Sequence, residues 1–352
     1  MERPSDYLRR TGPETPAMVH NNRGAMLYLE GDHAGARREY EAALAIEPEN
    51  ATALNNLGYA LAQEEKYDEA IRCYERALRL TPGHSMALTN LASARAALGD
   101  LQGAIDALGL AVDAAPDNTL AWNNLGKLLM AMGRLPEAEK AWRDALEIAP
   151  RDGKIKKQLG AVVAAQQRHA EGAAILREAL ELDPEDGTTW ANLGAVLFLR
   201  QDMGSAADAL RRALALEPEQ VDARRQLALV HLARGEREAA EAELRRALMI
   251  DPDHQSSRID LGVLLVASGD ARGAIEQLEH ALETDPAQER VRYHRALALQ
   301  QDGRVEDGRA ELETLAREPS GRYPEMAREA LELMRTAAAE PQRSQARPSH
   351  AG

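Results

Sequence analysis

The chain has few of the residues on which disulfide-rich, β-rich and metal-binding proteins depend. Its 352 residues include one cysteine, Cys73, and one phenylalanine, Phe198, and aromatic residues make up 3% of the sequence. One cysteine can form neither an internal disulfide nor a cysteine-rich zinc site. Because Ala and Leu dominate the apolar positions, rather than β-branched and aromatic residues, helices are favoured over strands. We therefore predict an all-α fold.

The chain also lacks an excess of positive charge and a long apolar run. It has 43 Lys and Arg against 57 Asp and Glu, a formal net charge of −14. A general nucleic-acid binder needs a basic stripe to face the phosphates, which this balance disfavours. Neither end carries an apolar stretch of signal-peptide or membrane-spanning length. We expect a cytoplasmic protein that neither binds nucleic acid nor inserts directly into a membrane.

Patterns that carry catalysis or metal binding are absent from the sequence. The nine histidines show neither HxxxH nor HxH spacing, and there is no glycine-rich phosphate loop and no GxSxG motif. The many Asp and Glu residues fall at expected helix starts and outer faces. We therefore expect no catalytic residues, no metal site and no cofactor, and a protein that is not an enzyme.

What the sequence does contain is a strict period of 34 residues. Eight of its 16 prolines follow this spacing: Pro48, Pro82, Pro116, Pro150, Pro184, Pro218, Pro252 and Pro286. Proline lacks a backbone N–H and clashes with the preceding turn, so each one predicts the end of a helix. A fixed period of this length is typical of proteins built from stacked repeats.

Between the prolines, residues of similar size recur at the same place in each 34-residue block, counted from Ala17. The eighth residue of every block is Gly or Ala, and the twenty-fourth is large, as in Gly58 and Tyr74. Small residues let two antiparallel helices approach closely, and large ones fill the space between them. In six blocks a glycine lies at the expected turn between the two helices. Four polar residues are placed to cap the next helix: Asn50, Asn118, Asp152 and Asp186.

This pattern resembles the tetratricopeptide repeat family, whose repeat is 34 residues long. The resemblance implies a right-handed superhelical solenoid of about nine helix pairs. We expect a disordered lead over residues 1–16, a repeat array over 17–322, a capping helix over 323–336 and a disordered tail over 337–352. The array should contain eight full repeats and an atypical ninth, because a terminal repeat has only one neighbour.

The resemblance further implies that the first helix of each repeat lines a concave groove and that the sixth residue of each block faces it. In five blocks this residue is asparagine: Asn22, Asn56, Asn90, Asn124 and Asn192. An asparagine amide both donates and accepts hydrogen bonds, so it can bind the backbone of an extended peptide of any sequence. Packed helices lie about 8–10 Å apart and an extended chain rises roughly 3.3 Å per residue, so one asparagine would meet about every third peptide residue.

A second interpretation of these asparagines stays open, since they can instead hydrogen-bond the neighbouring helix and fix the stacking angle. The two interpretations are not exclusive. The sixth residue is asparagine in each of the first four blocks, and becomes Gln158 in the fifth. We therefore expect peptide binding mainly in the N-terminal half.

Other side chains fall in columns that the family resemblance directs toward the groove. Tyr59, Met130 and Phe198 are candidate peptide contacts, although side chains in these columns can equally pack between adjacent helices. Three lysines form a candidate contact for an anion or an acidic motif, with a solvated charge run as the alternative: Lys127, Lys154 and Lys157. In the last three blocks the fourth residue is arginine: Arg224, Arg258 and Arg292. These arginines either form a second partner surface or pack over their own helix pair.

Together these features predict a non-enzymatic scaffold for protein–protein interaction. Its partner would be a protein or peptide whose extended segment lies in the concave groove. The alternative is a structural or assembly protein that self-associates through its repeats or its C-terminal tail, so homo-oligomerisation stays open.

Overall fold

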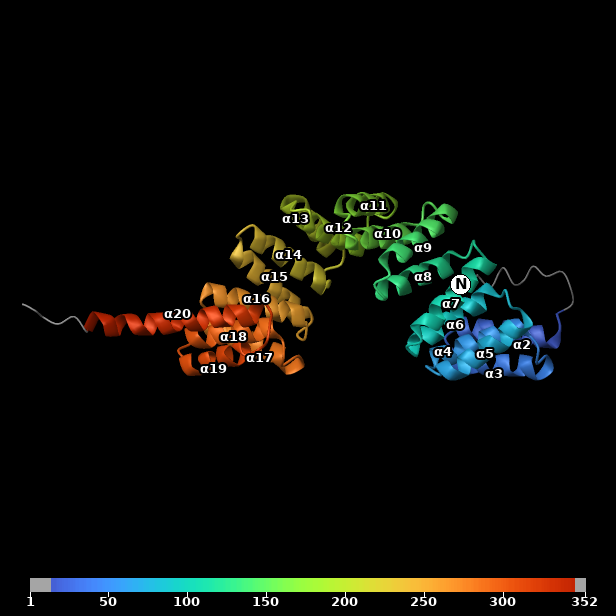
Figure 1. Ribbon diagram of the computed structural model, residues 1–352. Helices are drawn as coiled ribbons and strands as arrows, with labels where there is room; N and C mark the ends of the chain where they lie inside the picture. The colour runs from blue at the N-terminus through green and yellow to red at the C-terminus, as the bar shows by residue number, and fades with distance from the viewer. Residues whose placement is uncertain (1–13, 346–352) are drawn as a thin grey trace, which may run out of the picture. The chain divides into compact units, whose positions relative to one another are not determined.

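The chain is described here from a computed structural model that covers residues 14–345, with side chains to Thr336. All regular structure within this range is α-helical, and 19 helices, α2 to α20, follow one another along the chain (Figure 1). They pack in consecutive pairs, so the predicted all-α fold is confirmed. The expected disordered lead over 1–16 lies mostly outside the described residues, as do residues 346–352 of the expected tail.

The chain divides into two compact units, residues 1–184 and 185–352. The first unit contains α2 (Pro16–Leu29), α3 (His33–Ile46), α4 (Ala51–Gln63), α5 (Tyr67–Leu80), α6 (Ser85–Ala97), α7 (Leu101–Ala114), α8 (Thr119–Ala131), α9 (Leu135–Ile148), α10 (Gly153–Ala165) and α11 (His169–Leu182). The second contains α12 (Gly187–Leu199), α13 (Met203–Leu216), α14 (Val221–Ala233), α15 (Arg237–Ile250), α16 (Gln255–Ser268), α17 (Ala271–Thr284), α18 (Glu289–Gln301), α19 (Val305–Ala316) and α20 (Arg322–Gln345). Each unit has its own hydrophobic core.

The helix boundaries follow the proline period. From α3 to α17, every second helix of a repeat ends shortly before its periodic proline, as α3 does at Ile46 ahead of Pro48. The following first helix begins at the first residue of the next block, as α4 does at Ala51. All four predicted caps are present, each accepting a hydrogen bond from a backbone N–H of the next helix: Asn50, Asn118, Asp152 and Asp186.

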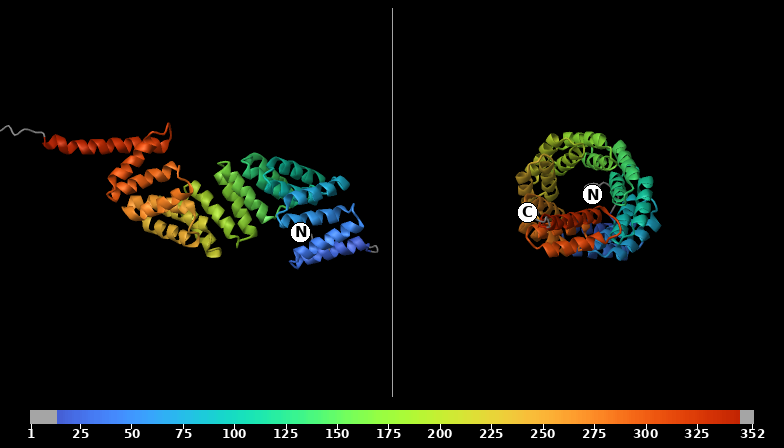
Figure 2. Two further views of the ribbon diagram at one scale, coloured as in Figure 1. Left: turned by 90° about the horizontal axis from the view of Figure 1, so that it is seen from below. Right: turned by 60° about the vertical axis from the view of Figure 1, so that its left-hand side comes forward.

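Within each unit the first helices form one layer and the second helices another (Figure 2). In the first unit α2, α4, α6, α8 and α10 contact one another in turn, whereas neighbouring second helices make little or no contact among the described residues. The side on which neighbouring helices come closest is the inside of a curved stack. The first helices therefore line the concave surface of each unit.

The eighth and twenty-fourth residues of a repeat meet where its two helices cross. A Cβ added to Gly58 would lie 2.6 Å from the Tyr74 ring, and one added to Gly126 would lie 2.5 Å from the Trp142 indole. Such distances leave no space for a methyl group. Where the eighth residue is alanine, the partner is leucine, as in Ala92 with Leu108. Glycine faces leucine in three further repeats, but every aromatic partner faces glycine: Tyr40, Tyr74 and Trp142.

The turn between the two helices of each repeat requires a left-handed backbone at the fifteenth residue. Six repeats place glycine there, as at Gly133 with φ +73°. Glu65, Gln167 and Gln201 adopt the same conformation, with φ between 60° and 66°. A side chain makes this conformation costly, which glycine avoids.

The ninth repeat departs from the others because a helix of another kind follows it. Leu315 replaces the usual alanine of its column and is fully buried, in a cluster that includes Ala327 and Leu331 of α20. The Tyr293 and Tyr323 rings pack 5.8 Å apart in the same region. The capping helix expected over 323–336 thus covers the last repeat, and the helix itself starts at Arg322 and continues to Gln345.

Replacing Gln167 by glycine should stabilise the protein, because it removes the cost of a left-handed side chain at an exposed turn. We expect the free energy of unfolding to rise by about 0.5–1 kcal/mol, after subtraction of the entropy that glycine loses on folding. Urea denaturation monitored by circular dichroism measures this change. The matched control, Gly133→Ala in the preceding repeat, should shift the midpoint in the opposite direction; shifts of the same sign would contradict the explanation.

Candidate functional site

The five candidate asparagines all lie on first helices, with their side chains half-buried. Asn22, Asn56, Asn90 and Asn124 are on α2, α4, α6 and α8 of the first unit, and Asn192 is on α12 of the second. They are therefore on the helix layer that lines the concave surfaces.

Two of these asparagines join successive repeats by hydrogen bonds. Asn56 Nδ2 donates to Oδ1 of Asn21 at 2.9 Å. In the next repeat Asn90 Nδ2 donates to Oδ1 of Asn55 at 3.0 Å. In both cases the sixth residue of a repeat binds the buried fifth residue of the preceding one. These bonds support the interpretation in which asparagine fixes the stacking of the repeats.

Other asparagines of the same column keep their amides available. Within residues 14–345, the side chains of Asn124 and Asn192 make no hydrogen bond, and Asn90 accepts none at its Oδ1. Asn22 donates only to Glu14, at the start of the described chain, at 3.3 Å. Both interpretations of the column are thus compatible with the geometry, with different asparagines serving each.

The three candidate apolar contacts are half-buried rather than fully open. Tyr59 on α4 packs edge-on against Tyr28 of α2, with ring centroids 5.3 Å apart. Burial, followed by the hydrogen bond with Tyr59, raises the pKa of Tyr28 to about 12. Met130 packs against the core of the first unit, and Phe198 lies near the end of α12. Tyr59 and Met130 therefore contribute to helix packing while leaving part of their surface accessible.

The candidate lysines lie on two first helices that contact each other. Lys127 is exposed on α8, and Lys154 is exposed on α10 beside the half-buried Lys157. Neither Lys127 nor Lys154 forms an ion pair among the described residues, whereas Lys156 pairs with Glu178 of α11. Two ammonium groups are thus available on this surface.

The structure reveals ion pairs between repeats that were not predicted from the sequence. Asp260, the sixth residue of the eighth repeat, is buried and accepts from Arg225 Nε at 2.7 Å and from Arg290 Nη2 at 3.0 Å. Arg225 is the fifth residue of the preceding repeat, so this ion pair occupies the position of the Asn55–Asn90 pair. Arg225 and Asp260 are 35 residues apart in the sequence, as are Asn55 and Asn90. This separation of opposite charges is a sequence signal for the ion pair, provided that the fifth and sixth residues of successive repeats are known to meet.

The arginine column of the last repeats is engaged within the fold. Arg224 binds Glu243 at 3.0 Å, Arg258 binds Gln277 at 3.0 Å, and Arg292 binds Glu318. These arginines reach over their own helix pair or its following turn. The contacts favour packing over a second partner surface.

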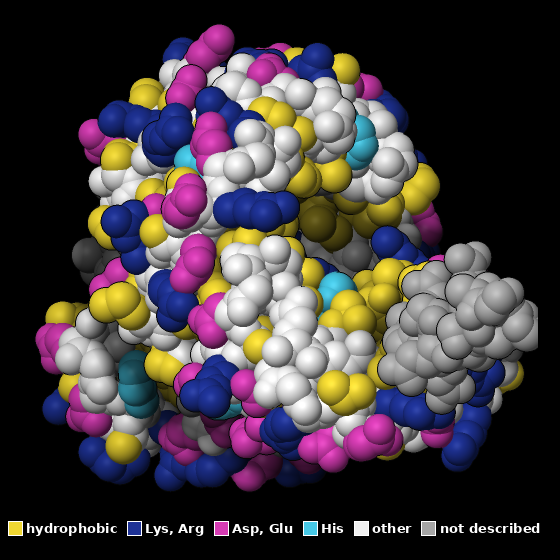
Figure 3. Space-filling view, turned by 90° about the vertical axis from the view of Figure 1, so that its left-hand side faces the viewer, with side chains coloured by type: hydrophobic (Ala, Val, Ile, Leu, Met, Phe, Trp, Pro, Cys, Tyr) yellow, Lys and Arg dark blue, Asp and Glu magenta, His cyan; other side chains and the backbone are white. Residues whose placement is uncertain are grey.

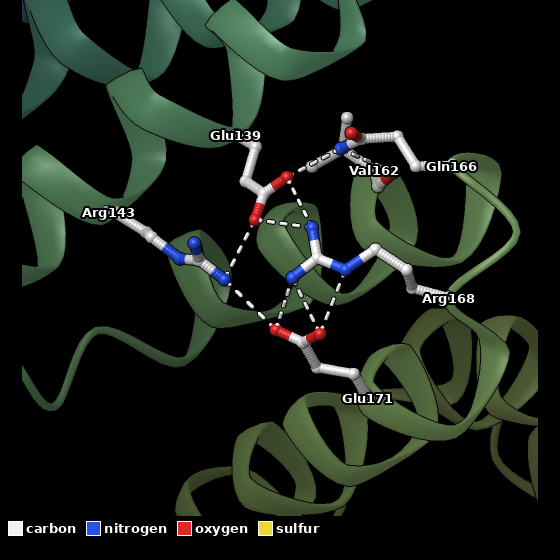
Figure 4. A network of polar contacts seen from close by, with 6 residues as sticks. All are labelled: Glu139, Arg143, Val162, Gln166, Arg168 and Glu171. Atoms are coloured by element: carbon white, nitrogen blue, oxygen red, sulfur yellow. Dashed lines mark hydrogen bonds and ion pairs between the residues drawn. The ribbon is translucent and has the colours of Figure 1, made fainter.

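A buried carboxylate in the first unit likewise has hydrogen-bond donors on both of its oxygens. Glu139 of α9 accepts from Arg143 at 2.7 Å, from Arg168 at 2.8 Å and from Gln166 at 2.6 Å (Figure 4). Burial by itself raises the pKa of Glu139, but the hydrogen bonds from Arg168 and Gln166 and the charges of Arg143 and Arg168 together outweigh it and hold that pKa below its usual value. With Glu171 the cluster ties the turn before α11 to α9, and it serves to position helices.

His294 takes the sixth place in the ninth repeat. Its side chain is half-buried near Tyr293 and Tyr323, and the buried Nδ1 has no hydrogen-bond partner among the described residues. Burial, with smaller contributions from Arg290 and Arg322, lowers the pKa of His294 to about 4. The histidine is therefore neutral in the folded protein near pH 7.

The surface carries charges of both signs. Figure 3 shows Lys and Arg side chains intermixed with Asp and Glu over one face of the molecule. In the described part of the chain, no three His, Cys, Asp or Glu residues are grouped as metal ligands. No described helix combines the length and apolar character needed to cross a bilayer.

Replacing Asp260 by asparagine should destabilise the second unit, because two arginines lose their carboxylate. We expect a loss of about 1–3 kcal/mol, limited by the partial exposure of both guanidinium groups. The double change Arg225→Asn with Asp260→Asn recreates the amide pair of the first unit and should restore most of this loss. Urea denaturation of both variants measures it; a double variant no more stable than Asp260→Asn would contradict the equivalence of the two pairs.

The free energy of unfolding should fall as the pH is lowered from about 6.5 toward 4. The reason is that the pKa of His294 is about 4 in the folded protein and 6.5 for an ordinary histidine. In this window the unfolded chain binds more protons, so acidification favours unfolding, by about 1–3 kcal/mol in full. His294→Gln should lose less stability between pH 7 and pH 5 than the wild type. Urea denaturation at each pH tests this, with exposed His33→Gln as the control that should behave like wild type.

The sequence matches known families of tetratricopeptide repeat proteins. Residues 3–229 match the family described as Cilia and flagella-associated protein 70 C-terminal domain. Residues 222–254 and 265–328 match two further tetratricopeptide repeat families. No curated protein sequence is significantly similar to the chain.

Solved structures show the same fold at low sequence identity. A tetratricopeptide repeat protein from Parabacteroides merdae is 18% identical over 71% of this chain and 98% of its own, with a TM-score of 0.55. The Cut9–Hcn1 structure of the APC/C is 16% identical over 84% of this chain and 58% of its own, with a TM-score of 0.58. PilW, a type IV pilus biogenesis factor, is 24% identical over 59% and 96%, with a TM-score of 0.54.

Proteins with tetratricopeptide repeats generally mediate protein interactions and are usually non-catalytic. The family match covers well over half of the sequence, and the helix pairs, their period and their caps agree with it. The chain therefore belongs to the tetratricopeptide repeat proteins, in the family of the Cilia and flagella-associated protein 70 C-terminal domain.

Proposed function

We propose that this chain is a protein-interaction scaffold that holds an extended segment of a partner protein on the concave surface of its first helices. One observation carries the proposal: in a column where Asn56 and Asn90 already join the repeats, Asn124 makes no side-chain hydrogen bond among the described residues. A half-buried amide with a free donor and acceptor is suited to pair with a peptide backbone.

Neighbouring side chains extend this surface. Tyr59 and Met130 provide partly exposed apolar area on α4 and α8, and Phe198 does so on α12. The unpaired Lys127 and Lys154, together with Lys157 on α10, suit an acidic group of the partner. The segment would thus be held mainly by its backbone, with apolar and acidic side chains adding selectivity.

The proposed setting is the cytoplasm, and the matched family indicates a more specific place within the cell. The family is described from a cilia- and flagella-associated protein, which supports an association with cilia or flagella.

The alternative, assembly through self-association, has one specific observation in its favour. On α2, the first helix of the array, Val19 and Met26 are 47% and 58% exposed. The corresponding residues of the next repeat, Ala53 and Ala60, are fully buried against their neighbours. A second copy that stacked on this face would bury both side chains.

The scaffold function is tested by the triple variant Asn56→Ala, Asn90→Ala, Asn124→Ala, used as bait for partners in a native lysate. We expect partner capture to fall at least about tenfold, because the backbone-binding amides are gone. Mass spectrometry of the captured proteins quantifies it.

The matched control is the double variant Asn21→Ala, Asn55→Ala. It removes the acceptors of the same two inter-repeat hydrogen bonds and keeps the sixth-column amides. Both variants should lose comparable stability, about 1–3 kcal/mol, while only the triple variant loses capture. Equal capture by the triple variant and the wild type would refute the scaffold proposal, and a wild type that light scattering shows to be a multimer without bound partners would favour the alternative.

A further inference from the structure

A cavity of about 490 Å³ opens in the second unit between α12 and α14. These are the first helices of adjacent repeats, and they contact each other. Residues of the turns before α14 and α16 also line it. The residues that decide its chemistry are Asn192, Glu217, Asp222, Gln226, Asp251 and His254.

Three carboxylates in the wall of this cavity lack a cationic partner of the arginine or lysine type. Among the described residues, the mostly exposed Asp222 forms an ion pair only with His254 Nε2, at 3.3 Å. Asp251 accepts from the backbone N–H of Asp253 at 3.1 Å, and Glu217 accepts from Gln220. The cavity therefore has an excess of negative charge.

The arginines nearest in sequence are held elsewhere. Arg224 donates to the Pro218 carbonyl and to Glu243, and Arg225 is bound to Asp260. Neither guanidinium belongs to the cavity lining. The fold thus leaves the negative charge of the cavity without internal compensation.

The amides of the cavity also lack donors to bind. Gln226, the sixth residue of its repeat, has a buried Oε1 atom with no hydrogen-bond partner among the described residues. Asn192, one repeat earlier, makes no side-chain hydrogen bond within the same range. A buried acceptor without a donor costs free energy, so a ligand that donates hydrogen bonds is favoured here.

The Glu217 carboxylate lies against the neighbouring first helix. A Cβ added to Gly187, at the start of α12, would lie 2.7 Å from Glu217 Oε1. The exposed carboxylate from the turn before α14 is therefore next to the first residue of α12.

We propose that this cavity binds an arginine side chain of the partner segment. The inference rests on the proposed scaffold function and adds the chemistry of one anchor residue. A guanidinium group has five N–H donors in a planar fork, which suit a cavity lined by carboxylates and side-chain amides. The volume lies within the range of about 300–1,000 Å³ found for ligand pockets, which accommodates the side chain and its adjoining backbone.

The test uses the full-length protein and N-acetyl-arginine amide as the probe, titrated while the side-chain amide resonances of Asn192 and Gln226 are followed by NMR. We expect both resonances to shift and saturate together. N-acetyl-citrulline amide, which has nearly the same shape without the charge, should bind at least about fivefold more weakly. Equal binding of the two probes, or no response of these resonances, would overturn the proposal.

A charge-matched pair of variants locates the site. Glu217→Gln with Asp222→Asn should weaken arginine binding at least about fivefold, while Glu219→Gln with Glu238→Gln, both exposed and outside the cavity, should leave it unchanged. Equal losses in the two pairs would mean that only the overall negative charge attracts the probe, and would overturn the proposal.

The outcome is separable from that of the scaffold proposal. The triple asparagine variant changes only the first unit, so it should bind the arginine probe as the wild type does. If the probe fails to bind while partner capture depends on Asn56, Asn90 and Asn124, the anchor site is wrong and the scaffold stands. If the probe binds and capture is insensitive to those asparagines, the cavity stands and the scaffold proposal is wrong.

Discussion

Within each unit, the stacking of a first helix on the preceding repeat is the interaction on which the rest of the structure depends. A helix pair has two broad faces and cannot bury both by itself. Ala60 of α4, for example, is fully buried in a cluster with Ala36 and Tyr40 of the preceding repeat. Stability in such an array is a sum over repeats and their interfaces. The end repeats show the consequence: α2 leaves Val19 and Met26 exposed, and the far end is covered by α20.

Two chemically different devices adjust this stacking at the same position. In the first unit, Asn90 binds Asn55 through an amide pair, and in the second, Asp260 binds Arg225 through a charged pair. The amide pair is neutral and small. In the charged pair both oxygens of the buried carboxylate are bound, because Arg290 of the following repeat donates to the second one. Asn124, at the same place in its repeat, makes no side-chain hydrogen bond among the described residues.

Much of the fold was predictable because the determinants act locally. Pro48 and its equivalents end helices through their own geometry, and Asn50 caps α4 with its own side chain. The close contact of Gly58 with Tyr74 follows from their place in the repeat. The left-handed conformation of three turn residues was not predictable from residue type, because Glu65, Gln167 and Gln201 adopt it without being glycine. There the neighbouring helices impose the turn, at a local cost that the packing offsets.

The candidate site was predictable only in part. The sequence placed Asn56, Asn90 and Asn124 in one column, but an amide can bind a neighbouring helix or a ligand equally well. Its choice depends on the fifth residue of the preceding repeat, such as Asn55, and on the distance between two helices that are far apart in sequence. The charged pair at Asp260 and the cavity beside Gln226 arise from the same long-range placement.

The sequence by itself therefore determined the class of protein, the number and length of its helix pairs and the caps that begin them. These features depend on backbone geometry and on contacts within one repeat, which a 34-residue period records directly. Only the tertiary structure decided which polar side chains are consumed in stacking and which remain available. Hydrogen bonds between repeats require two side chains to lie within about 3 Å, and that distance is set by the packing of whole helices.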